Sequence, residues 1–141
     1  VTLLLAFVAD PLLLRTPDVG CMVSDSIAVS HAAHAGAMYG MMSATAAHNN
    51  TMITSAAQGE AADISSNLTV TPSVYYVCSA AEAGTQYSTE AAAASACTGT
   101  GNHALEYVQV IASSSVTPPV HFPLLPASYR LSSTSVMEVE E

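Results

Sequence analysis

The hydrophobic and polar positions in the first third of the chain predict one very long helix. Residues 1–14 read VTLLLAFVADPLLL, and a helix-favouring, alanine-rich run follows and ends near residue 48. Interior prolines remove a backbone donor and clash with the preceding turn, and glycine adds conformational freedom. The pattern therefore predicts a helix over residues 1–48 with a possible break over 10–20. The alternative is two separate helices joined by a short linker. The residues predicted to form the break are Pro11, Pro17 and Gly20.

Small residues recur at three- and four-residue spacing in the second half of this helix, and such spacing favours close contact between helices. A helix over residues 1–48 would be roughly 70 Å long at about 1.5 Å per residue. A head made of the remaining residues would be only about 25 Å across. The helix must then protrude, and a protruding apolar helix needs lipid or other copies of itself. The residues predicted to pack in a core between copies are Leu3, Leu4, Leu5, Phe7, Val8, Leu12, Leu13, Leu14, Ala33, Gly36 and Gly40.

The rest of the chain predicts a small α+β head. A pair of asparagines indicates a new helix N-cap, and a short helix is expected over residues 51–64. Alternating apolar and polar positions predict strands over 67–77, 104–116 and 128–140. A helical turn is expected over 90–96.

A sheet of this size needs a helix over its apolar face, and the second half of the long helix is the expected cover. Val108, Val110 and Ala112 are expected on one face of the second strand, with Tyr107 and Ile111 on the other. The predicted fold class is α+β: a long protruding N-terminal α-helix, then a head with a short helix and a 3–4 stranded antiparallel sheet. Its two predicted units are residues 1–48 and 49–141.

The composition excludes one large class of partners. The 141 residues include two basic and eleven acidic residues and no lysine, which gives a formal charge of −9. Nothing in such a chain could neutralise phosphates, so nucleic acid is excluded as a partner. Charged residues make up only 9% of the chain, whereas the surface of an ordinary soluble domain is about 25–35% charged. This low charge content is more typical of secreted and envelope proteins.

Three cysteines leave one over if two of them pair. Cys78 and Cys97 bracket a loop of about 20 residues, and a disulfide between them is expected in an oxidising compartment. Cys21 is then expected to be a small, buried apolar residue of a packed helix. Asn49 and Asn67 match the N-x-S/T acceptor pattern and are possible glycosylation sites.

No motif for catalysis is found in the sequence. His31 and His34 lie three residues apart on one helix face, and with Asp25 or His48 they could touch a metal ion. Two histidines without a third fixed ligand are more often packing residues. The sequence contains no nucleophile–base pattern, phosphate-binding loop or metalloprotease motif. We therefore expect no enzyme activity, no cofactor and no bound metal.

Three N-terminal features and the C-terminal tail together carry a resemblance. Pro11-Leu12-Leu13-Leu14, Asp18-Val19-Gly20 and the run AAHAGAMYG are followed, much later, by a proline-rich crossing and a T-x-M-x-V-E-like end over Ser135–Glu140. In this order the chain resembles the TadE-like family, the minor pilins and pseudopilins of tight-adherence (Tad) secretion systems. The resemblance covers nearly the whole chain.

The resemblance also implies where the mature chain starts. Pilin-like proteins carry a glutamate at the fifth position, where it neutralises a neighbour's terminal amine during assembly. Counting back from Pro11 places that position at Leu5 and supports Val1 as the processed first residue. Leu5 cannot supply the charge, so the sequence departs from the family at this contact.

The pattern and the resemblance together predict a structural subunit of an extracellular, type IV pilus-like filament that takes part in cell adhesion. The chain would wait in the inner membrane and then polymerise with copies of itself through its N-terminal helix. The resemblance implies a prepilin peptidase and an assembly motor as partners. A minor pseudopilin that primes or anchors the filament is the first alternative. A membrane-anchored envelope domain that binds a ligand is the alternative of another class.

Overall fold

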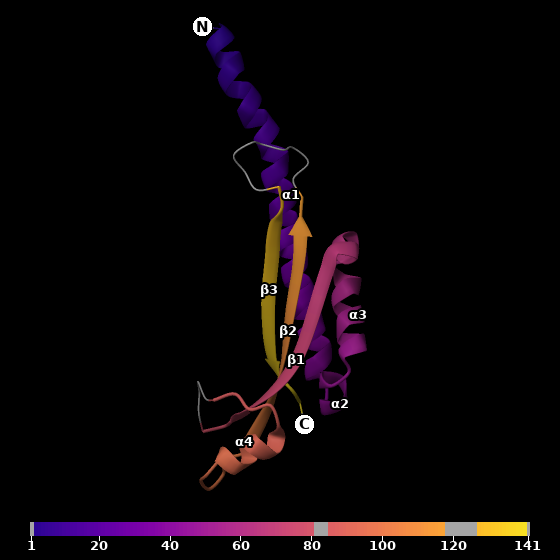
Figure 1. Cartoon of the computed structure of the whole chain (residues 1–141), viewed down its shortest axis with the longest axis vertical. Helices are drawn as coiled ribbons and strands as arrows, with labels where there is room; N and C mark the ends of the chain where they lie inside the picture. Colours follow the sequence, from indigo (N-terminus) through magenta and orange to yellow (C-terminus); the bar gives the residue numbers. More distant parts are fainter. Residues whose placement is uncertain (1, 81–84, 118–126, 141) are drawn as a thin grey trace.

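The chain folds as an α+β protein with a long N-terminal helix and a three-stranded antiparallel sheet (Figure 1). A computed structural model describes the backbone of residues 2–80, 85–117 and 127–140, and within these ranges the side chains from residue 20 onward. In chain order the elements are α1 (Thr2–Met41), α2 (Ala44–Ala47), α3 (Asn50–Glu60), the 3₁₀ helix η1 (Ala62–Asn67), β1 (Leu68–Cys78), α4 (Glu90–Ala96), β2 (Ala104–Val116) and β3 (Tyr129–Glu138).

Helix α1 has two parts with different surroundings. Its 40 residues correspond to about 60 Å at 1.5 Å per residue. The backbone is helical across Pro11, Pro17 and Gly20, where the sequence predicts a possible break. The N-terminal half extends past the end of the sheet, whereas the second half lies along the sheet (Figure 1). The second half of α1 therefore takes part in the core of the head.

The end of α1 comes earlier than the sequence predicts, because Ser43 starts a new helix. Ser43 is extended (φ −173°, ψ 160°), and its side chain accepts a hydrogen bond from the N–H of Ala46 at 3.2 Å. Serine favours such N-caps because its hydroxyl competes for backbone groups. The next helix, α3, begins as predicted: the N-cap Asn49 accepts a hydrogen bond from the N–H of Met52 at 3.2 Å.

Helix α3 is shorter than predicted, because the α-helix ends at Glu60 and a 3₁₀ helix follows. The segment Ala62–Asn67 is a 3₁₀ helix, in which the Ser65 hydroxyl donates to the Ala62 carbonyl at 2.9 Å. Such tight turns are common where an α-helix passes into another element. Here the 3₁₀ helix leads directly into β1.

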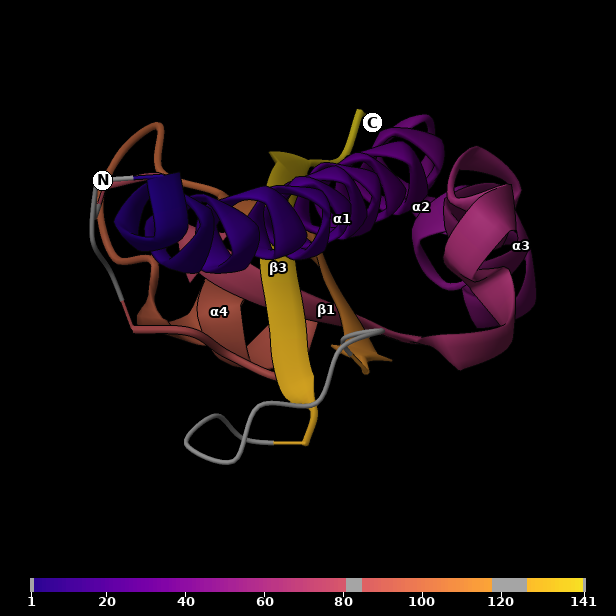
Figure 2. The ribbon, with the colours of Figure 1, turned by 90° about the horizontal axis from the view of Figure 1, so that it is seen from above.

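The sheet has the order β1-β2-β3, and all its pairs are antiparallel. Val110 on the central strand lies opposite Pro72 on β1 and Ser135 on β3. Pro72 is on an edge strand, as predicted, because a proline cannot donate to a second neighbour. Figure 2 shows α1 lying over the sheet with α3 beside it.

The core lies between the sheet and the helices. Val108, Val110 and Ala112 are fully buried, which confirms that they share one face of β2 and identifies that face as the covered one. One buried cluster joins Val29 of α1 to α3 and Ala112, and a second joins α1 and Ile53 of α3 to Val108 and Val110. Burial of a side chain such as Val or Ile contributes about 1.5–3 kcal/mol. The contacts of α1 and α3 with the sheet therefore stabilise the head.

Candidate functional site

The first half of α1 holds most of the residues predicted to pack between copies. The structure gives this segment a helical backbone, but its side chains lie outside the described residues. Packing between copies stays a prediction for all of them. They are Leu3, Leu4, Leu5, Phe7, Val8, Leu12, Leu13 and Leu14.

The small residues predicted for the same core have a different role in the structure. Ala33 is fully buried within the head. A Cβ atom added to Gly36 would lie 3.1 Å from Val110 Cγ1, and one added to Gly40 would lie 2.8 Å from Val108 Cγ2. The small-residue face of α1 is therefore filled by the chain's own sheet and is not open to a neighbouring copy. Residue spacing identified a close contact correctly but assigned it to the wrong partner.

The opposite face of α1 is apolar and open. Val23, Ile27 and Met38 are exposed by 54%, 51% and 50%. His31 and His34 are also exposed and lie between Ile27 and Met38 along the helix. No Asp, Glu, Lys or Arg is exposed between residues 20 and 41. This outward face of α1, defined by these five residues, presents no formal charge when both imidazoles are neutral.

Cys21 also lies on the surface of α1. The sequence predicts a buried cysteine, but the structure places an exposed, free thiol there. The apolar residues around Cys21 in the sequence suggested a packed position. They belong partly to the outward face of α1, so local hydrophobicity did not report burial.

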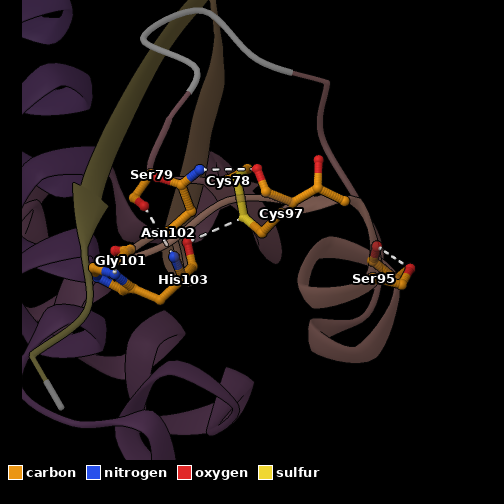
Figure 3. Close-up of a disulfide and its surroundings, with 9 residues drawn as sticks. Cys78, Ser79, Ser95, Cys97, Gly101, Asn102 and His103 are labelled. Carbon is orange, nitrogen blue, oxygen red and sulfur yellow. Dashed lines mark hydrogen bonds between the residues drawn. A yellow bond between two sulfur atoms is a disulfide. The ribbon is translucent and has the colours of Figure 1, made fainter.

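The predicted disulfide between Cys78 and Cys97 is confirmed (Figure 3). It joins the end of β1 to the residue after α4 across a sequence separation of 19, with 5.4 Å between the Cα atoms. Beside it, the N–H of Ser79 donates to the His103 carbonyl at 2.9 Å, and the N–H of His103 donates to Ser79 Oγ at 3.0 Å. The bridge holds the end of α4 against β1, and the two hydrogen bonds join the chain just after β1 to the chain just before β2.

The two possible glycosylation sites lie on the surface of the head. Asn49 and Asn67 are both exposed. The Oδ1 atom of Asn49 already caps α3, which leaves its amide nitrogen outside that hydrogen bond. Exposure is compatible with modification, and modification itself stays a prediction.

Three polar side chains, of which the sequence singled out only His48, meet where the sheet passes the end of α1. The imidazole Nε2 of His48 lies 3.1 Å from Glu106 Oε1, and the Tyr76 hydroxyl lies 3.4 Å from the same nitrogen. Glu106 Oε1 is buried and has no partner of good hydrogen-bond geometry in the described part of the chain. The contact is therefore an ion pair when the imidazole is protonated. This contact links the C-terminal end of the short helix α2 to β2.

The same cluster shifts the acidity of a tyrosine. Burial, then the negative charges of Glu106 and Glu90, and finally a hydrogen bond to Glu106 raise the pKa of Tyr76 above its ordinary value of 10.0. A signal for this cluster was present in the sequence. Glu106 alternates in phase with Val108 and Val110, so it had to point toward the covered face of the sheet.

The surface next to this cluster is hollow and mainly polar. One open hollow of about 470 Å³ is lined by His48, Tyr76 and Glu90, among others. Among the described residues, no group of three His, Cys, Asp or Glu side chains could hold a metal ion. His31 and His34 are thus not joined there by Asp25 or His48 in a site with three ligands.

The chain was compared with protein families, curated proteins and solved structures. No family model matches the sequence, and no curated protein or solved structure matches it significantly. Among the helices that the structure describes, none combines the length and the apolar content needed to cross a membrane.

Proposed function

We propose that this chain is a structural subunit of an extracellular, type IV pilus-like filament of Tad type, and that it polymerises through α1. The observation that carries the proposal is the division of α1 between two roles. The inner face of its second half is filled by the sheet, whereas its outward face keeps Val23, Ile27 and Met38 exposed. The helix then continues past the head toward the apolar residues 1–14 (Figure 1).

The electrostatics support self-assembly through this helix. The chain carries a formal charge of −9, so copies repel one another over most of their surface. The outward face of α1 has no carboxylate, and copies can approach there without like-charge repulsion. Each large aliphatic side chain removed from water contributes about 1.5–3 kcal/mol. Transfer from lipid contributes much less, so assembly from a membrane needs an external motor.

One observation favours another role for the same chain. The small-residue face is satisfied by the chain's own sheet, so the head needs no neighbour to be complete. That favours, as a second candidate, an envelope domain anchored through the first half of α1. A minor pseudopilin would use the same contacts as a major subunit and differ from it in abundance.

The first experiment is electron microscopy of material sheared from the source cells, with mass spectrometry of the same fraction. Filaments composed mainly of this chain are expected. A trace amount within filaments of another protein would assign the chain as a minor component. Recovery from membranes alone would refute the filament role and favour the anchored domain.

A pair of matched variants tests the contact surface. Ile27→Ser removes an exposed apolar side chain from the outward face of α1, and Met52→Ser removes one of 45% exposure from α3. We expect Ile27→Ser to reduce the yield of filaments and Met52→Ser to leave it unchanged. Neither side chain is buried, so both variants should keep the thermal stability of the head. Equal filament yields for the two variants would contradict the proposed interface.

A further inference from the structure

The two edges of the sheet are protected differently. On the β1 edge, Pro72 lacks a donor, and Tyr76 exchanges backbone hydrogen bonds with Tyr87 at 2.8 and 2.9 Å. Pro, charge and covering segments are the usual devices that keep an edge strand from pairing with another chain. From Leu131 to Met137 the β3 edge has no such device among the described residues: β3 pairs only with β2, and this stretch contains no proline and no charged residue.

The charges at the two ends of β3 are complementary. Arg130 and Glu138 are both exposed, and they lie at equal distances along the strand from Thr134. Arg130 has no ion pair in the described part of the structure, although the chain has only two basic residues. Glu138 accepts one hydrogen bond, from the Tyr107 hydroxyl at 3.1 Å, through Oε2.

We propose that the free edge of β3 is a self-association surface, on which two copies pair β3 with β3 in antiparallel orientation about Thr134. In this register Arg130 of each copy lies opposite Glu138 of the other, so both ends of the pair are ionic. In this register odd-numbered residues lie opposite odd-numbered residues. Leu131 of one copy therefore lies opposite Met137 of the other, on the helix-covered side of both sheets. The result is one continuous six-stranded sheet with a two-fold axis, an isologous dimer.

The position of α1 fits the same dimer. α1 lies mainly over β2 and β3 and hardly touches β1. Strands in a sheet are about 4.8 Å apart, so the two-fold axis would place the two α1 helices about 10 Å from each other, close to the usual packing distance. The exposed residues of α1 between 20 and 41 include no Asp, Glu, Lys or Arg, so this approach is not opposed by formal charge when His31 and His34 are neutral. The pairing does not depend on the filament proposal.

A single-cysteine crosslink tests the register. The full chain is purified in mild detergent with Cys21→Ser, which removes the exposed free thiol, and is then oxidised. Thr134→Cys places its thiol opposite itself across the axis, within the range of disulfide Cα distances of about 4.4–6.8 Å. Ser132→Cys is the matched control, because the two copies of residue 132 are about 13 Å apart in this register. A disulfide-linked dimer from Thr134→Cys alone is expected. No dimer from Thr134→Cys, or equal dimer from both variants, would overturn the proposal.

A charge exchange tests the pairing without a crosslink. Arg130→Glu and Glu138→Arg each make both ionic contacts like-charged, and each alone should raise the dimer dissociation constant about tenfold. Mixing the two variants restores opposite charges at both contacts, so the mixture should form heterodimers. Both side chains are exposed, and recovery of the dimer on mixing also shows that each variant is folded. Failure of the mixture to dimerise more tightly than either variant alone would refute the pairing.

Discussion

Replacement of Gly40 by alanine tests how tightly α1 is packed on its own sheet. The new methyl group would lie 2.8 Å from Val108 Cγ2 and 3.1 Å from Val108 Cγ1, well inside the contact distance of about 3.5–4.0 Å between carbon atoms. Val108 is fully buried on the central strand, and its branched side chain has few rotamers. The backbone of α1 or β2 must therefore move to accommodate the methyl group.

The magnitude follows from two opposing effects. Overpacking of this kind costs about 1–3 kcal/mol, whereas alanine in place of glycine inside a helix gains about 1 kcal/mol. The free energy of unfolding should therefore fall by roughly 0–2 kcal/mol. Gly59→Ala in α3 is the matched control, because a Cβ atom there meets nothing within 4 Å. Gly59→Ala should only gain stability, so the two variants should differ by about 1–3 kcal/mol.

The assay is urea unfolding of the full chain in mild detergent, followed by far-ultraviolet circular dichroism. The double variant Gly40→Ala/Val108→Ala removes the two methyl groups that clash, and its loss of stability should be smaller than the sum of the single losses. The reasoning would be refuted if Gly40→Ala were as stabilising as Gly59→Ala. In that case the close contact between α1 and β2 would not exist in solution.

Two further predictions concern the end of the sheet. The double variant Cys78→Ser/Cys97→Ser should lose about 3 kcal/mol of unfolding free energy, because it frees a loop of 19-residue separation; reductant should lower the wild type to the same level and leave the variant unchanged. Glu106→Gln should lower the pKa of Tyr76 in an ultraviolet titration, although burial keeps that pKa above 10.0. Since the folded state holds the Tyr76 proton more tightly, this group's stabilisation is complete below about pH 10 and falls as the pH rises toward the raised pKa. An unchanged titration in Glu106→Gln would exclude Glu106 as a cause.

The strands were the part of the fold most accessible from the sequence. The predicted limits of β2 agree with the structure, and alternation placed Val108, Val110 and Ala112 on one face because a strand has a two-residue period. Which of the two faces is buried became clear only from the structure. The end of α1 was not accessible in the same way. The residues after Ser43 favour helix as strongly as those before it. The end of α1 therefore depends on the hydrogen bond by which the Ser43 side chain caps the next helix.

The candidate site was only partly accessible. Small residues at Gly36 and Gly40 marked a close contact, but a pattern on one helix does not contain the surface that fills it. The contact between His48 and Glu106 joins residues far apart in the chain. It depends on the position of α2, which ends just before His48. The pairing of Cys78 with Cys97 was predictable because few cysteines leave few choices.

The unbroken backbone of α1 also has a mechanical consequence. The N-terminal half of α1 and the half buried in the core are one helix that runs along the strands (Figure 1). A pull on the N-terminal end is thus transmitted along the axis into the head and loads the contacts of α1 with Val108, Val110 and Ile53 together, in shear. In shear, all contacts along the interface carry the force and break together. When the force acts at one end of an interface, the contacts break one after another. We therefore expect the packing between α1 and the head to resist tension applied at the N-terminal end.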